Sequence, residues 1–276
     1  MASPPPPPFA SAAASARDAA DHLSRLNGVR GLRTAILALL LPIGSRRAAR
    51  AWEIETAGHP EAEALLVDVS HLAGPARLPW FETLVSRMRS VPLAERQNLL
   101  EATRRVMGAR GTVRPIDRLH WLAMRQRLGG PTAAGVRAGA SSDLSELPAA
   151  DVSALAAYSA FLSRLVPFEA SDDASRGTAW YDDVMSPWQG RSVVPKCHPP
   201  DSDGLVHALQ ELQALPWMQR PMLVRGWVTA ALQHSRYGRL DDTAADSLRL
   251  SCSLLDSPPP PELARHYGTA APETPR

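Results

Sequence analysis

The chain has 276 residues, of which 45% are apolar and 5% aromatic, and its formal net charge is +2. Its 30 basic and 28 acidic side chains are nearly balanced, so the sequence lacks the concentrated basic surface that nucleic-acid binding requires. Ala and Leu dominate the apolar fraction, and both favour helices, whereas strands favour β-branched and aromatic residues. The composition predicts an all-α protein and excludes nucleic acid as a partner.

The two ends of the chain and its most apolar stretch limit the folded part. Residues 1–20 are rich in Pro, Ala and Ser, and residues 259–276 in Pro, so we expect a disordered leader and a disordered tail. The longest apolar run, Ala35–Leu41, is far shorter than the ~20 residues that span a bilayer, and it predicts a buried helix in a cytoplasmic protein. Peripheral contact with the inner membrane surface is the alternative, because basic residues flank this run: Arg30, Arg33, Arg46 and Arg47.

Helical spacing of apolar residues marks a first helical unit over residues 21–130. Apolar side chains from Phe81 to Met88 recur at i, i+3, i+4 and i+7, which indicates one face of a helix. Pro92 suits the start of the next helix, where its missing N–H costs nothing. The spacing predicts helices at 32–41, 46–56, 60–73, 81–88, from 92 to the break at Gly111, and at 116–128.

A second helical unit is predicted over residues 149–258, after a linker at 131–148 that is rich in Gly, Ala and Ser. Within it, residues 167–203 are polar and interrupted by Gly and Pro. This is long for a structureless connection, so we expect a functional or mobile loop there. The predicted helices of this unit are 149–166, 203–215, 217–234 and 242–255.

The second unit repeats the spacing of the helix-start proline and the turn glycine that is found in the first unit. Pro92 and Pro216 are 124 residues apart, while Gly111 and Gly238 are 127 apart, which implies a three-residue insertion between proline and glycine. The 124-residue separation also links Met88 with Leu212, Arg96 with Arg220, and Leu99 with Leu223. The pattern predicts two pseudo-repeated three-helix elements packed with connecting helices. Chance similarity between Ala- and Leu-rich amphipathic helices is the alternative.

The sequence also resembles the C-terminal helical extension of bacterial HtpX-like membrane zinc metallopeptidases. The similarity covers residues 34–261, weakly between 130 and 200, and its motifs mark helix starts and ends without carrying chemistry. The matching segments are Ala35–Leu41, Leu78–Leu84, Val91–Arg96, Gly238–Leu240, Leu248–Arg249 and Leu255–Pro260. The resemblance implies an interaction or regulatory module without the peptidase domain.

The helix–turn–helix elements are similar to the tellurite-resistance (TerB-type) helical fold. That fold usually carries Asp-Gly in its turn and an acidic residue one or two turns later. Here Arg110 and Tyr237 precede the turn glycines, and Asp117 and Asp246 are the nearest matches to the later acid. The departure removes two carboxylates from any cation site that the resemblance implies.

No catalytic motif accompanies these helices. HExxH would place two histidines on one helical face around zinc, and none of the eight histidines lies in such a motif. There is no phosphate-binding GK[ST] loop and no GxSxG nucleophile turn. Cys197 and Cys252 form no CxxC pair, and Cys197-His198 lacks a second ligand pair at zinc-site spacing. We therefore expect a non-enzymatic chain without cofactor or metal.

One segment of the long loop combines acids with aromatic residues. Trp180, Tyr181, Asp182 and Asp183 are predicted to bind a partner, since aromatic and acidic side chains suit protein recognition, and Asp172 and Asp173 precede them. A divalent cation is a second ligand that these paired acids would suit. The alternative is a solvated surface loop with a packed aromatic residue. Four other tryptophans lie on predicted helices, where packing in the core or between the units is expected, with a partner anchor as the alternative for one of them: Trp80, Trp121, Trp217 and Trp227.

These observations predict a non-catalytic helical interaction or regulatory module that binds a protein partner. One alternative is a fragment or subunit of a membrane zinc metallopeptidase whose catalytic part lies elsewhere. The second is a cation-binding stress module of the TerB type.

Overall fold

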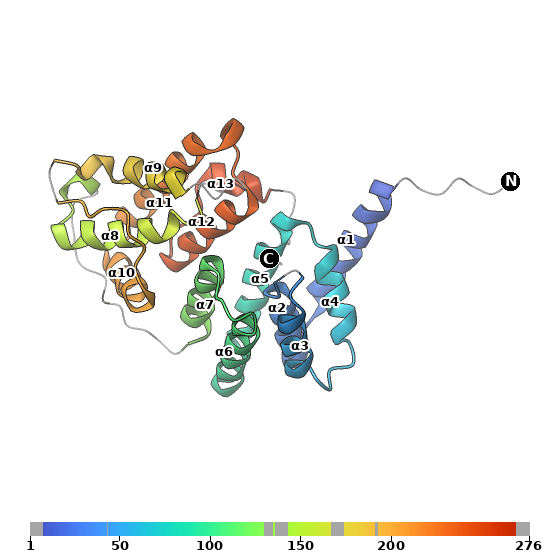
Figure 1. Ribbon diagram of the computed structural model, residues 1–276. Coiled ribbons are helices and arrows are strands. Elements are labelled where there is room, and N and C mark those ends of the chain that lie inside the picture. Colours follow the sequence, from blue (N-terminus) through green and yellow to red (C-terminus); the bar gives the residue numbers. More distant parts are fainter. Residues whose placement is uncertain are drawn as a thin grey trace. The chain divides into compact units, whose positions relative to one another are not determined.

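The structure is a computed structural model that describes residues 8–42, 44–129, 135, 143–166, 174–190 and 193–268. Within these residues it contains thirteen α-helices and three short 3-10 helices, and no β-strand (Figure 1). The all-α prediction is confirmed. The chain divides into two compact units, one of residues 1–117, 124–130 and 267–276, and the other of residues 118–123 and 131–266.

Most helices have the positions that periodicity predicts. The first seven are α1 (Pro8–Arg25), α2 (Val29–Leu39), α3 (Arg46–Glu55), α4 (Ala62–His71), α5 (Gly74–Met88), α6 (Leu93–Gly108) and α7 (Pro115–Leu128). The next are η1 (Leu144–Glu146), α8 (Ala149–Leu162), α9 (Ala174–Met185), η2 (Ser186–Trp188) and α10 (Ser202–Ala214). The last are α11 (Gln219–His234), η3 (Arg236–Gly238), α12 (Asp242–Leu254) and α13 (Pro261–His266).

In the first unit, α2 is the central helix. Eight of its eleven residues are buried, and it packs against α4, α5 and α6, while α1 covers α4 and α3 covers α6. The Ala/Leu-rich run that the sequence singles out lies in this helix and is enclosed by its neighbours. A helix that is apolar around most of its circumference requires such enclosure.

The second unit is built in the same way around α8. Ten of its fourteen residues are buried, and it packs against α9 and α10, while α11 packs against α9 and α12. Its core also holds buried hydrogen bonds: the Trp227 Nε1–H donates to Ser159 Oγ at 3.0 Å, and the Tyr158 hydroxyl bonds to Ser251 Oγ at 3.0 Å. The Tyr158 and Trp227 rings lie 5.4 Å apart. These contacts join α8 to α11 and α12 in one arrangement.

Three parts of the chain differ from the sequence-based expectation. The leader predicted as disordered over 1–20 contains α1, because its Ala-rich part favours a helix and buries Ala19 and Leu23. The loop predicted over 167–203 contains α9 and η2, and the tail predicted over 259–276 contains α13, where Leu263 is buried. Nearby Pro and Gly residues made irregular structure the expectation in these segments. The greater part of the predicted linker at 131–148 lies outside the described residues.

An ion-pair cluster ties three helices of the first unit together. Glu55 on α3 accepts hydrogen bonds from Arg33 on α2, at 2.7 Å, and from Arg105 on α6. Its carboxylate is only 10% exposed, so its interactions with the two guanidiniums are screened less than those of surface pairs. The hydrogen bond from Arg105 is the largest cause that lowers the pKa of Glu55, with the charges of both arginines adding to it.

Replacing Glu55 by Gln is expected to lower the free energy of unfolding at pH 7 by about 1–3 kcal/mol, since two arginines lose their charged acceptor. Because the folded pKa lies below the unfolded value, this stabilisation is fully present above the unfolded pKa and disappears as pH falls through the folded one. Urea denaturation at pH 7 and near pH 3 measures both effects, and the two proteins should converge at the lower pH. Glu101→Gln, at an exposed position, is the control that should change little.

Gly177 on α9 lies in close contact with the end of α8. A Cβ atom there would lie 2.2 Å from the Ser163 carbonyl oxygen, so Gly177→Ala should destabilise the protein by about 1–3 kcal/mol through overpacking. At Gly226 on α11, a Cβ atom would have no other atom within 4 Å, so Gly226→Ala should instead stabilise by up to ~1 kcal/mol through helix propensity. Thermal or urea unfolding of the two variants tests the close approach, and equal shifts would contradict it.

Candidate functional site

The aromatic residues of the predicted partner-binding segment lie in the interior of the second unit. Trp180 is 0% and Tyr181 2% exposed, and both belong to α9. The Trp180 Nε1–H donates to the Trp227 carbonyl at 3.4 Å, and the Tyr181 hydroxyl donates to the Pro195 carbonyl at 2.6 Å. Both side chains lie on the buried face of α9, so they stabilise the unit and are not accessible to a partner.

The acidic residues of the same segment remain at the surface. Asp182 and Asp183 are exposed, and an Asp183 carboxylate oxygen lies 2.5 Å from Nε2 of His234 on α11. A partner-binding role for these two carboxylates stays a prediction. Asp172 and Asp173 lie outside the described residues.

The Tyr181 phenol is unsuited to proton transfer near neutral pH. Burial raises its pKa to about 12, and the nearby Cys197 and Asp182 add to this shift. It therefore stays protonated and donates its hydrogen bond to Pro195. The neighbouring Cys197 Sγ lies 3.4 Å from Ser163 Oγ. This contact favours a packing role for the thiol.

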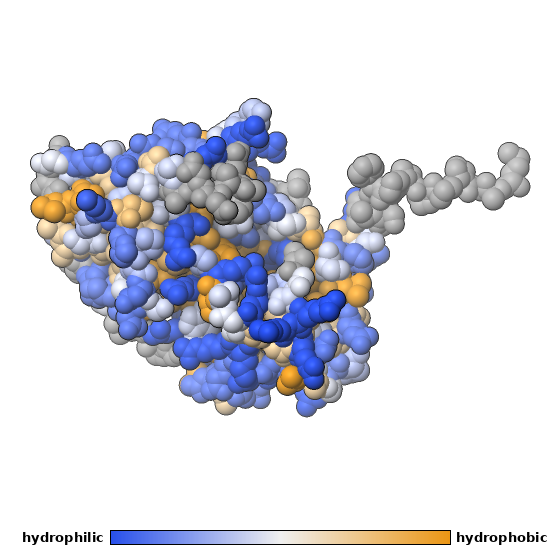
Figure 2. Space-filling model, in the orientation of Figure 1, coloured by the Kyte–Doolittle hydropathy of each residue, from blue (hydrophilic) through white to orange (hydrophobic). Residues whose placement is uncertain are grey.

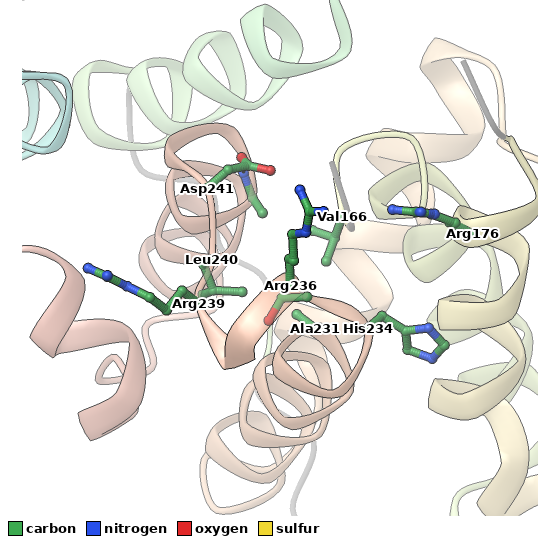
Figure 3. Close-up of a pocket in the computed structure, with 10 residues that line it drawn as sticks. Val166, Arg176, Ala231, His234, Arg236, Arg239, Leu240 and Asp241 are labelled. Atoms are coloured by element: carbon green, nitrogen blue, oxygen red, sulfur yellow. The ribbon is translucent and has the colours of Figure 1, made fainter. Parts of the chain in front are cut away.

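A pocket of about 190 Å³ lies around the turn between α11 and α12 (Figure 3). Its ionisable lining residues are Arg176, His234, Arg236, Arg239 and Asp241. In Figure 3, the Arg236 side chain stands between Val166 and Asp241, while the Arg239 side chain points away from the other labelled residues. The pocket therefore mixes cationic groups with a carboxylate, and the cations predominate.

Three polar residues of this pocket, His234, Ser235 and Asp241, make structural contacts. Asp241 is the N-cap of α12 and accepts a hydrogen bond from the Ala244 N–H at 2.8 Å; burial is the main cause that raises its pKa. The Ser235 hydroxyl donates to the Leu232 carbonyl, and His234 pairs with Asp183. The serine is thus not paired with a histidine base, as nucleophilic catalysis requires.

Asp117, one of the two acids that align with the TerB-type pattern, has a structural role. Asp117 is 2% exposed, accepts a hydrogen bond from the Arg114 backbone N–H at 3.2 Å, and pairs with the Arg114 guanidinium at 2.7 Å. It therefore caps α7. In the part of the chain that the structure describes, no three His, Cys, Asp or Glu side chains are grouped as a metal site requires.

The most apolar exposed cluster lies at the start of α11, and we call it the Trp217 patch. It consists of Trp217, Met218 and Met222, which are 71%, 51% and 44% exposed. Packing in the core or between the units was expected for Trp217, with a partner anchor as the alternative, and the structure leaves this side chain exposed. Trp80 and Trp227, in contrast, are buried as expected. The helical period carries the missing signal, since the buried stripe of α11 runs through Leu223, Val224, Trp227 and Val228 and leaves the patch on another face.

A buried arginine holds the turn that presents the Trp217 patch. Arg220 is 6% exposed, and its guanidinium donates to the carbonyls of Gln213, Leu215 and Leu255. The first two acceptors belong to the end of α10, and the third follows α12. The arginine therefore satisfies carbonyls that a helix end leaves unpaired and fixes the start of α11.

An open groove of about 580 Å³ lies in the first unit, between the end of α2, the start of α3, α4 and the start of α5. Its apolar lining residues are Ala38, Leu41, Pro42, Ala49, Leu66 and Val69. Gly44, Ser45, Arg46, Ser70 and Arg77 complete the lining. We call this feature the α2–α4 groove.

The face of the molecule that Figure 2 shows is mostly polar. In Figure 2, hydrophilic residues predominate and hydrophobic ones appear in separate areas. None of the helices in the described ranges combines the length and apolar character that crossing a bilayer requires.

Comparison with known proteins assigns no family to the chain. No family model matches it, and no curated protein or solved structure is significantly similar to it. Functional inference therefore depends on the exposed patch, the pocket and the groove.

Proposed function

We propose that the chain is a non-catalytic helical interaction module that binds a protein partner through the Trp217 patch. The carrying observation is an exposed tryptophan, flanked by two exposed methionines, on a turn that buried Arg220 holds in place. Tryptophan is enriched at the energetic centres of protein interfaces, and methionine adapts its shape to an apolar partner.

The indole ring also keeps a polar group for a partner. Trp217 Nε1–H has no hydrogen-bond partner among the described residues, whereas the indoles of Trp180, Trp188 and Trp227 all donate within the protein. An interface that covers Trp217 would bury a large apolar area and offer an acceptor to this N–H. Because the turn is already ordered, binding there would cost little conformational entropy.

We further infer that the two units arose as pseudo-repeats. The central helix of each unit packs on the helix that precedes the repeated proline, so α2 packs on α5 and α8 packs on α10. The helix that follows the central helix packs on the helix that begins after this proline, so α3 packs on α6 and α9 packs on α11. The turn glycines Gly111 and Gly238 both have positive φ, +88° and +65°, which favours glycine. These parallels support the repeat that the 124-residue spacing predicts.

The proposed copies differ at the surface that matters for recognition. The position equivalent to Trp217 holds Leu93, which is 44% exposed. The position equivalent to Arg220 holds Arg96, whose buried Nε has no acceptor among the described residues. The aromatic side chain and the ordered turn are thus combined in the second copy, which supports one dedicated docking surface.

The resemblance to HtpX-like extensions and to the TerB-type fold stays a proposal with the same scope. It is compatible with two helical units, and it implies that the chain acts as an interaction or regulatory part of a larger enzyme. The identity of the partner separates the alternatives. A zinc metallopeptidase bound at the Trp217 patch would favour a subunit of such an enzyme, and a partner unrelated to peptidases would favour an independent adaptor.

Trp217→Ala, alone and with Met222→Ala, should weaken binding of the partner at least about 30-fold, near 2 kcal/mol, because it removes the apolar anchor. Partners retained by the immobilised wild-type chain from native extract are identified first. Their affinity for each purified variant is then measured by calorimetry. Trp217→Ala should leave the unfolding midpoint nearly unchanged, since the side chain is 71% exposed.

Tyr237→Asn is the matched control for this experiment. Tyr237 is 86% exposed and has a φ of 58°, a conformation that Asn tolerates, so the variant removes an exposed aromatic ring without backbone strain. It should bind the partner as the wild type does. Equal binding by wild type and Trp217→Ala, or the absence of any stoichiometric partner, would overturn the proposal.

A further inference from the structure

The α2–α4 groove has the dimensions and lining of a recognition site. Its volume of about 580 Å³ lies within the range of ligand pockets, roughly 300–1,000 Å³, and six of its eleven lining residues are Ala, Leu, Pro or Val. It lies within the first unit and contains no residue of the Trp217 patch.

The groove is held open by its own hydrogen bonds. Arg77 donates to the Leu39 carbonyl at 3.1 Å and to the Val69 carbonyl at 3.0 Å, and so joins the end of α2 to α4. Ser45 caps the start of α3 by accepting from the Ala48 N–H at 3.2 Å. These bonds satisfy polar groups of the framework, so an apolar ligand would enter without breaking them.

The start of α3 beside the groove is basic, and one of its arginines, Arg46, belongs to the lining. Arg46, Arg47 and Arg50 are exposed on the first turns of α3, and none forms an ion pair with a described residue. A helix N-terminus carries positive partial charge, so three arginines there are mutually repulsive and unfavourable with the helix dipole. No lining residue is acidic, and the nearby Asp68 of α4 is already paired with His22 at 2.5 Å.

We propose that the α2–α4 groove binds a short amphipathic segment of a partner protein, whose apolar side chains enter the groove and whose carboxylates pair with Arg46, Arg47 and Arg50. Charge complementarity selects an acidic segment, because it would relieve the repulsion at the start of α3. The concave shape selects a peptide chain over a flat bilayer surface, since a groove accommodates the side chains of one helical face. This site is independent of the Trp217 patch.

The test uses the full chain and two fluorescent synthetic peptides of about 14 residues, each with Leu at i, i+3, i+4 and i+7 of a helix. One carries Glu at the remaining exposed positions and the other carries Lys. Fluorescence anisotropy should show binding of the acidic peptide only, weakening as salt rises. The triple variant R46E/R47E/R50E should weaken that binding at least about tenfold. Ala49→Glu, which places a bulky carboxylate in the groove, should weaken it similarly while remaining folded.

Two controls separate this site from general electrostatics and from the Trp217 patch. The triple variant R225E/R239E/R265E makes the same change in net charge in the second unit, and it should bind the acidic peptide as the wild type does, as should Trp217→Ala. Equal losses of peptide affinity in both triple variants, or no effect of Ala49→Glu on that affinity, would overturn the proposal that the groove binds the peptide. Failure of the acidic peptide to bind would also overturn it. The same holds if the chain instead binds vesicles containing phosphatidylglycerol through these arginines.

Discussion

The structure depends on one constraint that occurs twice, the enclosure of a helix that is apolar around most of its circumference. Eight of eleven residues of α2 and ten of fourteen of α8 are buried. Neither helix is stable with any broad face in water, so each requires several neighbours at once. The surrounding helices are amphipathic and present only one apolar face, which is why their positions follow from the central helix. The buried bonds of Tyr158 and Trp227 then select one packing of these neighbours in the second unit.

Arginines at helix ends connect this packing to the two proposed recognition surfaces. Arg77 bonds carbonyls at the end of α2 and within α4, Arg87 bonds those of Leu23, Ser24 and Leu26 at the end of α1, and Arg220 bonds those that follow α10 and α12. Helix C-termini leave carbonyls unsatisfied and carry negative partial charge, so a guanidinium is a suitable cap. Arg77 lies in the α2–α4 groove, and Arg220 supports the turn of the Trp217 patch. The same interaction that stabilises the fold therefore gives both surfaces a defined shape.

Much of the fold was predictable because the periodicity of apolar residues, and the prolines and glycines at helix ends, are local features of the sequence. Apolar spacing and the proline before α6 located most helices to within a few residues, and the glycine turns marked the breaks between them. Three helices were missed, since α1, α9 and α13 lie beside Pro- and Gly-rich sequence that indicates irregular structure. In each case burial of a few apolar side chains, such as Trp180 or Leu263, outweighs the local preference for a loop.

The sequence by itself determined that the protein is helical, which segments form its central helices, and that common catalytic motifs are missing. Only the tertiary structure decided which aromatic residues are accessible. Trp180 and Tyr181 were expected at a binding surface and are buried, while Trp217, expected to pack in the core or between the units or to anchor a partner, is exposed. The reason is physical: periodicity shows which residues share a helical face, but the face that is buried depends on which neighbours enclose it. Likewise, Arg46 and Ala49 are close in sequence, but they line a groove only because the fold brings residues of α2, α4 and α5 to the same place.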